Sequence, residues 1–386
     1  MTGLRRIVVV GASQAGCATA AALRRFGFDG TITVLGEERH APYTRPPLSK
    51  GVLTGSESDD SVYLSTNDDI ELVTAVAAVE LDPHGRRVQL DDGDSIGYDG
   101  LVIASGARAR RLSGRDVDEV TLRTLDDAVA LRQRLSAASD VAVAGGGFLG
   151  MELASSAAHL GKRVTVVDQV TPLSGRLGSL LSDMCLTAAA ETGVKILISS
   201  KGVEIAENGA RRLQTTEGTA LAEADIVITA VGDIPNTEWL RTSQLPLADG
   251  VVVDSNCQVA PRIVAAGDVV SLPGRDGRRT RSPHWSNALS QATIAAATLL
   301  GREPDARLGD SPPFFWTQVF DLRIRLAGQL PPAGEPVVLD GSIADRHALL
   351  AWPPVTPAAR FGTAAAVNYP ISAPKLTKLA QNPPNR

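Results

Sequence analysis

Two short glycine-rich loops have the residue spacing needed to hold a phosphate group. Residues 145–150 read GGGFLG, and residues 11–16 read GASQAG, in which a serine replaces the middle glycine. In G-x-G-x-x-G loops the first glycine allows a sharp turn, the second lets backbone approach a pyrophosphate, and the third lets helix and strand pack closely. The sequence therefore predicts two dinucleotide sites, one with Gly145, Gly147 and Gly150, the other with Gly11, Ser13 and Gly16. For the first loop, taken alone, an ordinary tight turn from strand to helix stays open as the alternative.

An acidic residue follows each loop at the distance expected for a contact with the adenosine ribose. Glu37 lies 26 residues after Gly11, and Asp168 lies 23 residues after Gly145, close to the usual spacing of about 20 residues. A carboxylate bonds the ribose 2′-hydroxyl and repels a 2′-phosphate. The residue after Asp168 is Gln169 and not an arginine that would bind the 2′-phosphate of NADPH. The second site is therefore predicted to prefer NADH.

The elements that position these residues repeat along the chain. Residues 7–37 and 141–168 each read as an apolar strand, a glycine loop, an Ala/Leu-rich helix and a second apolar strand that leads to an acid. This is the order of a βαβ unit, and short Val-rich runs without alternation are typical of buried parallel strands. The pattern predicts an α/β fold with two Rossmann-like dinucleotide-binding domains.

Composition narrows the class of protein. The chain has 386 residues, a net charge of -5 and 44% hydrophobic residues, which favours a globular protein of two or three domains and argues against a primary nucleic-acid role. No apolar run approaches the roughly 18 residues of a membrane span. The run at residues 7–10 is shorter than a signal-peptide core of about 7–15 residues, so a cytoplasmic protein is expected. Cys17, Cys185 and Cys257 are far apart and predict neither disulfides nor a dithiol.

Longer motifs resemble a known family. The segment APYTRPPLSK at 41–50 is similar to the P-Y-x-R-P-P-L-S-K segment of oxygenase-coupled, NADH-dependent ferredoxin reductases, which are related to apoptosis-inducing factor. Four further stretches agree in order and spacing: LVIASGARARRLSG (101–114), AVGDIPNTEWL (230–240), IVAAGDVV (263–270) and HWSNALSQA (284–292). The resemblance covers about residues 5–330 and implies FAD and NADH as cofactors.

The resemblance assigns roles to individual residues. Arg45 and Lys50 are implied to contact FAD, with Lys50 near the flavin ring, where an ammonium stabilises negative charge on the reduced flavin. Asp268 is implied to bond the ribitol, and Trp285 and Asn287 to line the FAD site. Ordinary structural roles stay open: a proline-rich surface loop around residue 45, a turn at Asp268, and a core tryptophan at Trp285.

On the nicotinamide side, the resemblance implies that Glu152 reaches the nicotinamide and can pair with Lys50, which makes these two the expected catalytic residues. The alternative is a carboxylate that interacts with the helix dipole. Gly106, Gly232 and Trp316 fall in matching motifs and are expected to contact cofactor. The chain departs from the family pattern F-W-S-D-Q at Thr317, Gln318 and Val319, which leaves the identity of the electron acceptor open.

The implied architecture is the FAD/NAD(P)-linked reductase fold with a small C-terminal α+β domain. The FAD domain is expected at 1–110 and 235–310, the NAD domain at 111–234, and the C-terminal domain at 311–386. The Pro- and Gly-containing stretch before residue 311 is typical of a linker.

The leading hypothesis is electron transfer from NADH through FAD to a small iron–sulfur ferredoxin or rubredoxin that serves an oxygenase or cytochrome P450. Two alternatives stay open: a flavin-dependent NADH oxidase, quinone or small-molecule reductase, and a redox-sensing or scaffolding flavoprotein. No metal site is expected, and the sequence leaves monomer and homodimer open. Acceptor docking, or simply an exposed basic hairpin, is expected at four arginines: Arg275, Arg278, Arg279 and Arg281.

Overall fold

The computed structural model describes residues 3–113, 118–206, 211–273, 279–356 and 359–383. The chain divides into two compact units. The first unit consists of Met1–Thr44, Val62–Arg108 and Ile234–Ser311, and the second consists of Arg45–Ser61, Ala109–Asp233 and Pro312–Arg386. Each unit contains one of the two glycine loops.

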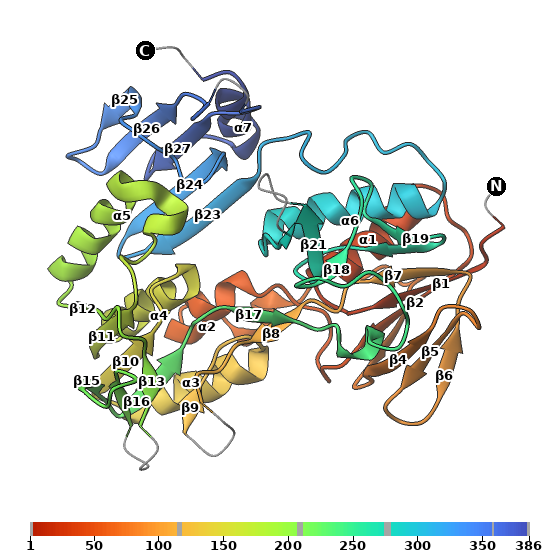
Figure 1. Ribbon diagram of the computed structural model, residues 1–386, viewed down its shortest axis with the longest axis horizontal. Coiled ribbons are helices and arrows are strands. Elements are labelled where there is room, and N and C mark those ends of the chain that lie inside the picture. Colours follow the sequence, from red (N-terminus) through yellow and green to blue (C-terminus); the bar gives the residue numbers. More distant parts are fainter. Residues whose placement is uncertain (1–2, 114–117, 207–210, 274–278, 357–358, 384–386) are drawn as a thin grey trace. The chain divides into compact units, whose positions relative to one another are not determined.

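A six-stranded sheet forms the centre of the first unit, in the order β19-β20-β7-β1-β2-β3; β1, β2, β7 and β19 are labelled in Figure 1. Neighbours from β20 to β3 are parallel, and β19 is antiparallel to β20. The strands are β1 (Arg6–Val10), β2 (Thr31–Gly36), β3 (Glu71–Thr74), β7 (Gly100–Ile103), β19 (Gln258–Ala260) and β20 (Ile263–Ala265). Parallel strands buried on both faces explain the continuous valine and isoleucine runs.

Alternate residues of β1 pack into two different cores. Ile7 and Val9 face α1 (Gln14–Arg25) and α6 (Trp285–Leu299), which pack against each other. Val8 and Val10 face the antiparallel meander of β4 (Ala78–Asp82), β5 (Arg87–Leu90) and β6 (Ser95–Gly97). This three-layer arrangement holds the carboxyl end of β1, and with it the first loop, against the start of α1. The unit also contains β18 (Val251–Val252), β21 (Val270–Pro273), β22 (Arg279–Thr280) and a 3-10 helix at Glu238–Leu240.

The second unit contains a five-stranded parallel sheet in the order β12-β11-β10-β16-β9. Its strands are β9 (Glu119–Val120), β10 (Asp140–Ala144), β11 (Arg163–Asp168), β12 (Lys195–Ile198) and β16 (Ile226–Thr229). The helices are α3 (Leu125–Ala137), α4 (Phe148–His159), which packs on β10 and β11, and α5 (Ser174–Glu191). A smaller sheet of β13 (Glu204–Ile205), β14 (Arg212–Gln214) and β15 (Ala220–Glu223) covers one face.

The last part of the chain, blue in Figure 1, forms an antiparallel sheet in the order β23-β24-β27-β26-β25. Its strands are β23 (Phe314–Val319), β24 (Leu322–Gly328), β25 (Val337–Ser342), β26 (His347–Trp352) and β27 (Thr363–Val367), and α7 (Ala373–Gln381) packs on β24 and β27. The predicted α/β class, with two Rossmann-like sheets and a small C-terminal α+β part, is confirmed.

The proline-rich segment belongs to the second unit although its sequence neighbours belong to the first. It forms a 3-10 helix at Pro46–Ser49 and the short helix α2 (Gly51–Thr54), and a second 3-10 helix follows at Asp59–Val62. Arg132 of α3 binds Asp59 with two hydrogen bonds of 2.6 and 2.8 Å and donates to the Val52 carbonyl at 2.9 Å. These bonds attach the segment to α3.

The remaining strands, β8 (Ala107–Ala109) and β17 (Asp233–Pro235), pair with each other. Over the described ranges, none of the helices has the length and apolar character that crossing a bilayer requires.

Candidate functional site

The first loop makes the strand-to-helix turn that the sequence predicts. Gly11 has a φ of +117°, and a Cβ placed there would lie 2.1 Å from the Ala104 carbonyl oxygen. A Cβ on Gly16 would lie 1.9 Å from the Gly11 carbonyl oxygen. Ser13 is the N-cap residue of α1, with an ordinary extended backbone at φ -120°. The two glycines are therefore required by backbone packing, whereas a glycine at the serine position is not.

The second loop repeats this geometry. Gly145 has a φ of +102°, with a Cβ 2.4 Å from the Ala230 carbonyl oxygen, and a Cβ on Gly150 would lie 1.8 Å from the Gly145 oxygen. Gly147 is the N-cap of α4 at φ -71°. A Cβ there would meet nothing within 4 Å, so the protein itself leaves open space at the middle position of the second loop.

The two acids differ in how they are held. The Asp168 carboxylate accepts the Gly146 N–H of the second loop at 2.5 Å and the Gln169 N–H at 2.5 Å. Its position at the end of β11 is therefore tied to the loop. Glu37 directly follows β2 and is exposed. Contact of either acid with a ribose hydroxyl stays a prediction.

Four further predicted residues lie in the first unit. Gly106 follows β7 with a φ of +65°, and Asp268 lies in the turn after β20, half-buried, where its carbonyl accepts from Arg281 at 3.1 Å. Asn287 donates to the Ser282 carbonyl at 2.9 Å. Trp285, at the start of α6, is 39% exposed, so it is not a core tryptophan, and its ring is accessible at a helix N-terminus.

In the second unit, Lys50 and Glu152 come together as a largely buried ion pair. Nζ of Lys50 lies 2.5 Å from Oε2 of Glu152, with side chains 17% and 10% exposed. Glu152 lies in the first turns of α4, directly after the second loop. A buried charge is stable only if it is paired and hydrogen-bonded, so the lysine and the carboxylate depend on each other.

Two hydroxyl groups whose contact with Glu152 was not predicted from the sequence complete this cluster. Ser49 donates to Glu152 Oε2 at 2.7 Å, and Thr317 donates to Oε1 at 2.8 Å. Trp316 also lies here, with its ring centroid 5.0 Å from Nζ of Lys50, within the range of a cation–π contact. Residues 49 and 317 carry no local sequence signal because they are far from Glu152 along the chain.

Two more predicted residues lie in the second unit. Arg45 precedes the 3-10 helix of the proline-rich segment and donates to the Arg123 carbonyl. Gly232 follows β16 at a φ of +104°, and its carbonyl accepts the Arg110 N–H at 3.0 Å. Arg45 thus anchors the segment that carries Lys50. Contact of either residue with a cofactor stays a prediction.

Two of the four arginines predicted to dock an acceptor, Arg279 and Arg281, lie among the described residues. Arg275 and Arg278 lie outside the described residues, and Arg279 is exposed. The side chain of Arg281 is only 8% exposed and lies 3.3 Å from Asp249. Arg281 therefore stabilises a turn of the first unit, and its prediction as an exposed docking residue is wrong.

Both loops fit a dinucleotide. In each loop the turn leads directly into the N-terminus of a helix, and the middle residue of the loop is the helix N-cap. The N–H groups at a helix N-terminus bind a pyrophosphate. Within the first loop, Oε1 of Gln14 is buried and has no hydrogen-bond partner among the described residues. An orphaned polar atom at this place fits a loop completed by a bound group.

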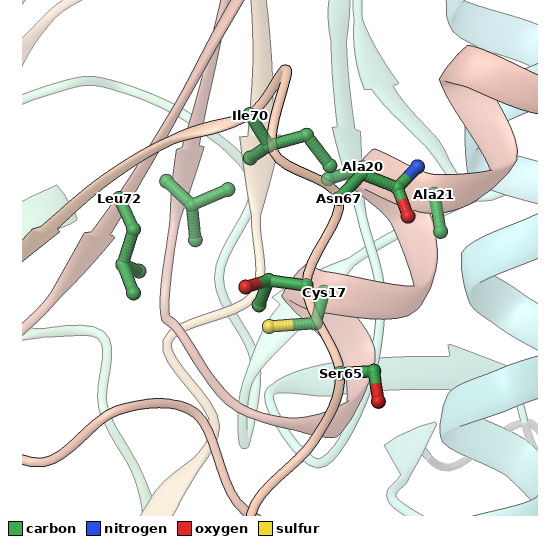
Figure 2. Close-up of a pocket in the computed structure, with 9 residues that line it drawn as sticks. Cys17, Ala20, Ala21, Ser65, Asn67, Ile70 and Leu72 are labelled. Carbon is green, nitrogen blue, oxygen red and sulfur yellow. The ribbon is translucent and has the colours of Figure 1, made fainter.

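A cavity of about 20 Å³ lies beside α1, lined by Cys17, Ser65, Asn67 and Leu72 among others (Figure 2). Its volume suits a single water molecule and not a cofactor. Burial raises the pKa of the Cys17 thiol to about 11, and Cys185 and Cys257 are buried free thiols. The described residues contain no cluster of three or more potential metal ligands.

Comparisons with known proteins agree with this geometry. Residues 5–292 match the model of the pyridine nucleotide-disulphide oxidoreductase family. The chain is 33% identical, over 97% of its length and 96% of the relative, to the ferredoxin–NAD(+) reductase component of a 3-phenylpropionate/cinnamic acid dioxygenase from Photorhabdus laumondii. It is 35% identical to rhodocoxin reductase of Rhodococcus erythropolis, over 87% of this chain and 81% of that one.

Among solved structures, the covalent complex of putidaredoxin reductase with putidaredoxin matches with a TM-score of 0.86 and 28% identity, over 98% of this chain and 93% of the other. These likenesses confirm the resemblance predicted from the sequence, and with it the oxidoreductase class. The chain belongs to the pyridine nucleotide-disulphide oxidoreductase family.

Proposed function

We propose that the protein is an FAD-containing reductase that takes electrons from NADH and passes them to a small iron–sulfur ferredoxin serving an oxygenase or cytochrome P450. The observation that carries the proposal is the pair of glycine loops with the same backbone geometry in one chain. Two dinucleotide sites suit an enzyme that holds one cofactor and consumes another. The relatives include a ferredoxin–NAD(+) reductase component and rhodocoxin reductase, and the solved relative is putidaredoxin reductase in covalent complex with putidaredoxin.

Residues of the two units would bind different cofactors. In the first unit, Gly11, Ser13 and Gly16 would hold the FAD pyrophosphate, and Glu37 its ribose. In the second unit, Gly145, Gly147 and Gly150 would hold NADH, with Asp168 on the ribose. FAD, when bound, supplies the chemistry of accepting an electron pair and releasing electrons singly.

The protein's own contribution to the reaction is orientation and charge. The buried pair of Lys50 and Glu152 lies directly after the second loop, at the start of the helix that would receive NADH. Their opposite charges compensate each other in a site from which water is largely excluded, where electrostatic effects are strong. A location in the cytoplasm remains a prediction from the sequence.

The test is a visible spectrum of the purified protein, followed by NADH oxidation with and without a ferredoxin coupled to cytochrome c. We expect bound flavin and ferredoxin-dependent reduction of cytochrome c. Flavin with fast NADH consumption that is independent of ferredoxin would favour a flavin-dependent oxidase or small-molecule reductase. That alternative is supported by Gln318 and Val319, which depart from the family pattern. Bound flavin with negligible turnover would favour a sensing or scaffolding role, and absence of flavin would overturn the proposal.

A further inference from the structure

Thr317 is a buried residue of β23 whose hydroxyl group reaches the Glu152 carboxylate. Its exposed fraction is 2%, and Oγ1 lies 2.8 Å from Oε1 of Glu152. Along β23, Phe315, Thr317 and Val319 are the buried residues of an alternating pattern. A hydroxyl in such an apolar row is costly unless it is hydrogen-bonded, so the bond to Glu152 satisfies both groups.

The two oxygens of Glu152 have different partners. Oε2 receives the Lys50 ammonium at 2.5 Å and the Ser49 hydroxyl at 2.7 Å, and Oε1 receives Thr317. The last torsion of a glutamate side chain has a broad, shallow preference. A carboxylate held through one oxygen can therefore still turn, whereas a donor on the second oxygen fixes its plane.

A second bond fixes β23 against the same face of α4. The Phe320 N–H donates to Oγ of Ser155 at 2.8 Å, and Ser155 lies three residues after Glu152, on the same side of the helix. The end of β23 is thus tied to α4 close to the point where Thr317 meets Glu152, so the hydroxyl is held in place by the backbone of its own strand.

We propose that Thr317 is a positioning residue, which holds the Glu152 carboxylate in the orientation that the reaction with NADH requires. This rests on the proposed function, because the part that Glu152 plays at the nicotinamide comes from the family resemblance. Through this contact the C-terminal sheet helps to orient Glu152.

The test compares three substitutions in the full-length flavoprotein. Thr317→Val keeps the shape and removes the hydroxyl, and Thr317→Ser keeps the hydroxyl. Thr363→Val is the matched control, since Thr363 of β27 is also 2% exposed in the same sheet and donates to the Gln329 carbonyl instead. The measurement is the rate of flavin bleaching by saturating NADH in rapid mixing, together with the dissociation constant for NADH.

We expect the bleaching rate of Thr317→Val to fall about tenfold, the size of one hydrogen bond to a charged group, with the dissociation constant changed less than about twofold. Thr317→Ser and Thr363→Val are expected to keep the wild-type rate to within about twofold. A loss of rate in Thr363→Val equal to that in Thr317→Val would overturn the proposal, because the effect would then belong to sheet packing.

A second readout needs no turnover. In protein labelled with carboxyl-13C glutamate, the Glu152 resonance is identified by its disappearance in Glu152→Gln. The chemical shift of this resonance is expected to change in Thr317→Val and to remain unchanged in Thr363→Val. An unmoved resonance together with a wild-type bleaching rate in Thr317→Val would overturn the proposal. If Thr317→Val does not fold, Thr317→Ala replaces it in both measurements. If the wild-type protein lacks flavin, the proposed function fails, and the resonance alone decides whether Thr317 orients Glu152.

Discussion

The two glycine loops have nearly the same backbone, and among the three glycine positions of the motif their sequences differ only at the middle one, which the backbone leaves free. In both loops the first and third glycines would place a Cβ within about 2.5 Å of a carbonyl oxygen. The middle residues, Ser13 and Gly147, have negative φ values of -120° and -71° and serve as helix N-caps. The fold therefore dictates two glycines of each motif, and the middle residue is free to match the ligand.

This difference explains why an imperfect motif can be a working one. Serine adds one hydroxymethyl group at a place where the backbone is extended, so Ser13 costs the first unit no strain. The open space at Gly147 is a property of the second loop. We infer that the second loop allows the closer approach of its cofactor, which suits NADH, the cofactor that enters and leaves in each cycle.

The largest expected effect concerns the feature that the loops share. Gly16→Ala and Gly150→Ala each force a methyl group to within about 2 Å of a carbonyl oxygen, a clash that only a backbone shift can relieve. We expect each substitution to lower the free energy of unfolding by about 3 kcal/mol or more, measured by thermal unfolding. A variant that keeps the wild-type melting temperature would show that its helix does not pack this closely against the loop.

A smaller effect is expected at the acid of the second loop. Asp168→Ala removes the proposed partner of the ribose and the carboxylate that accepts from Gly146 and Gln169. The KM for NADH is expected to rise about tenfold, as for one lost hydrogen bond to a charged group. The KM for NADPH should change less, because the lost carboxylate also repelled a 2′-phosphate. Steady-state kinetics with both cofactors measure this, and equal changes would contradict the ribose role.

Exchanging the middle residues should have a mild effect. Ser13→Gly is expected to leave the flavin content unchanged, since glycine only enlarges the space. Gly147→Ser should fold normally, because its Cβ meets nothing within 4 Å, and should raise the KM for NADH by a few-fold at most. Flavin absorbance measures the flavin content of Ser13→Gly, and titration with NADH measures the KM of Gly147→Ser. Loss of flavin in Ser13→Gly would mean that the serine hydroxyl is required for binding.

The smallest expected effect concerns the residue that directly follows each loop. This is Cys17 after the first loop, which can ionise, and Met151 after the second, which cannot. Burial raises the pKa of the Cys17 thiol to about 11, whereas an unfolded thiol ionises near pH 8.5. Between these values the unfolded chain has lost a proton that the folded chain keeps, so stability falls as pH rises from about 9 to 11. The melting temperature of Cys17→Ser should therefore fall less than that of the wild type over this pH range. The same loss in both proteins would contradict the burial of this thiol.

The loops and their acids could be predicted because each βαβ unit is formed by one short, continuous stretch of sequence. The strand, the turn and the helix are neighbours along the chain, and the steric need for Gly11, Gly16, Gly145 and Gly150 is local. The pairing of Lys50 with Glu152 follows only from the family resemblance, since nothing local connects a proline-rich segment with a helix about 100 residues later.

Other features of the site depend on tertiary packing that no local pattern encodes. Ser49 and Thr317 reach Glu152 from positions 103 and 165 residues away. Residues 45–61 belong to the second unit, and the bonds that join Asp59 to Arg132 are also made between residues distant in sequence. The sequence shows the basicity of Arg281 but not its burial beside Asp249, which is why its prediction as a surface charge is wrong.

One pair of reciprocal variants decides whether each loop serves a different cofactor. Ser13→Leu and Gly147→Leu both place a bulky side chain at a helix N-cap whose backbone is compatible with it, so both should fold. The measurement is the visible spectrum of each purified variant before and after anaerobic addition of NADH. We expect a colourless Ser13→Leu protein and a yellow Gly147→Leu protein that NADH fails to bleach. A yellow Ser13→Leu protein, or a colourless Gly147→Leu protein, would contradict this division between the loops.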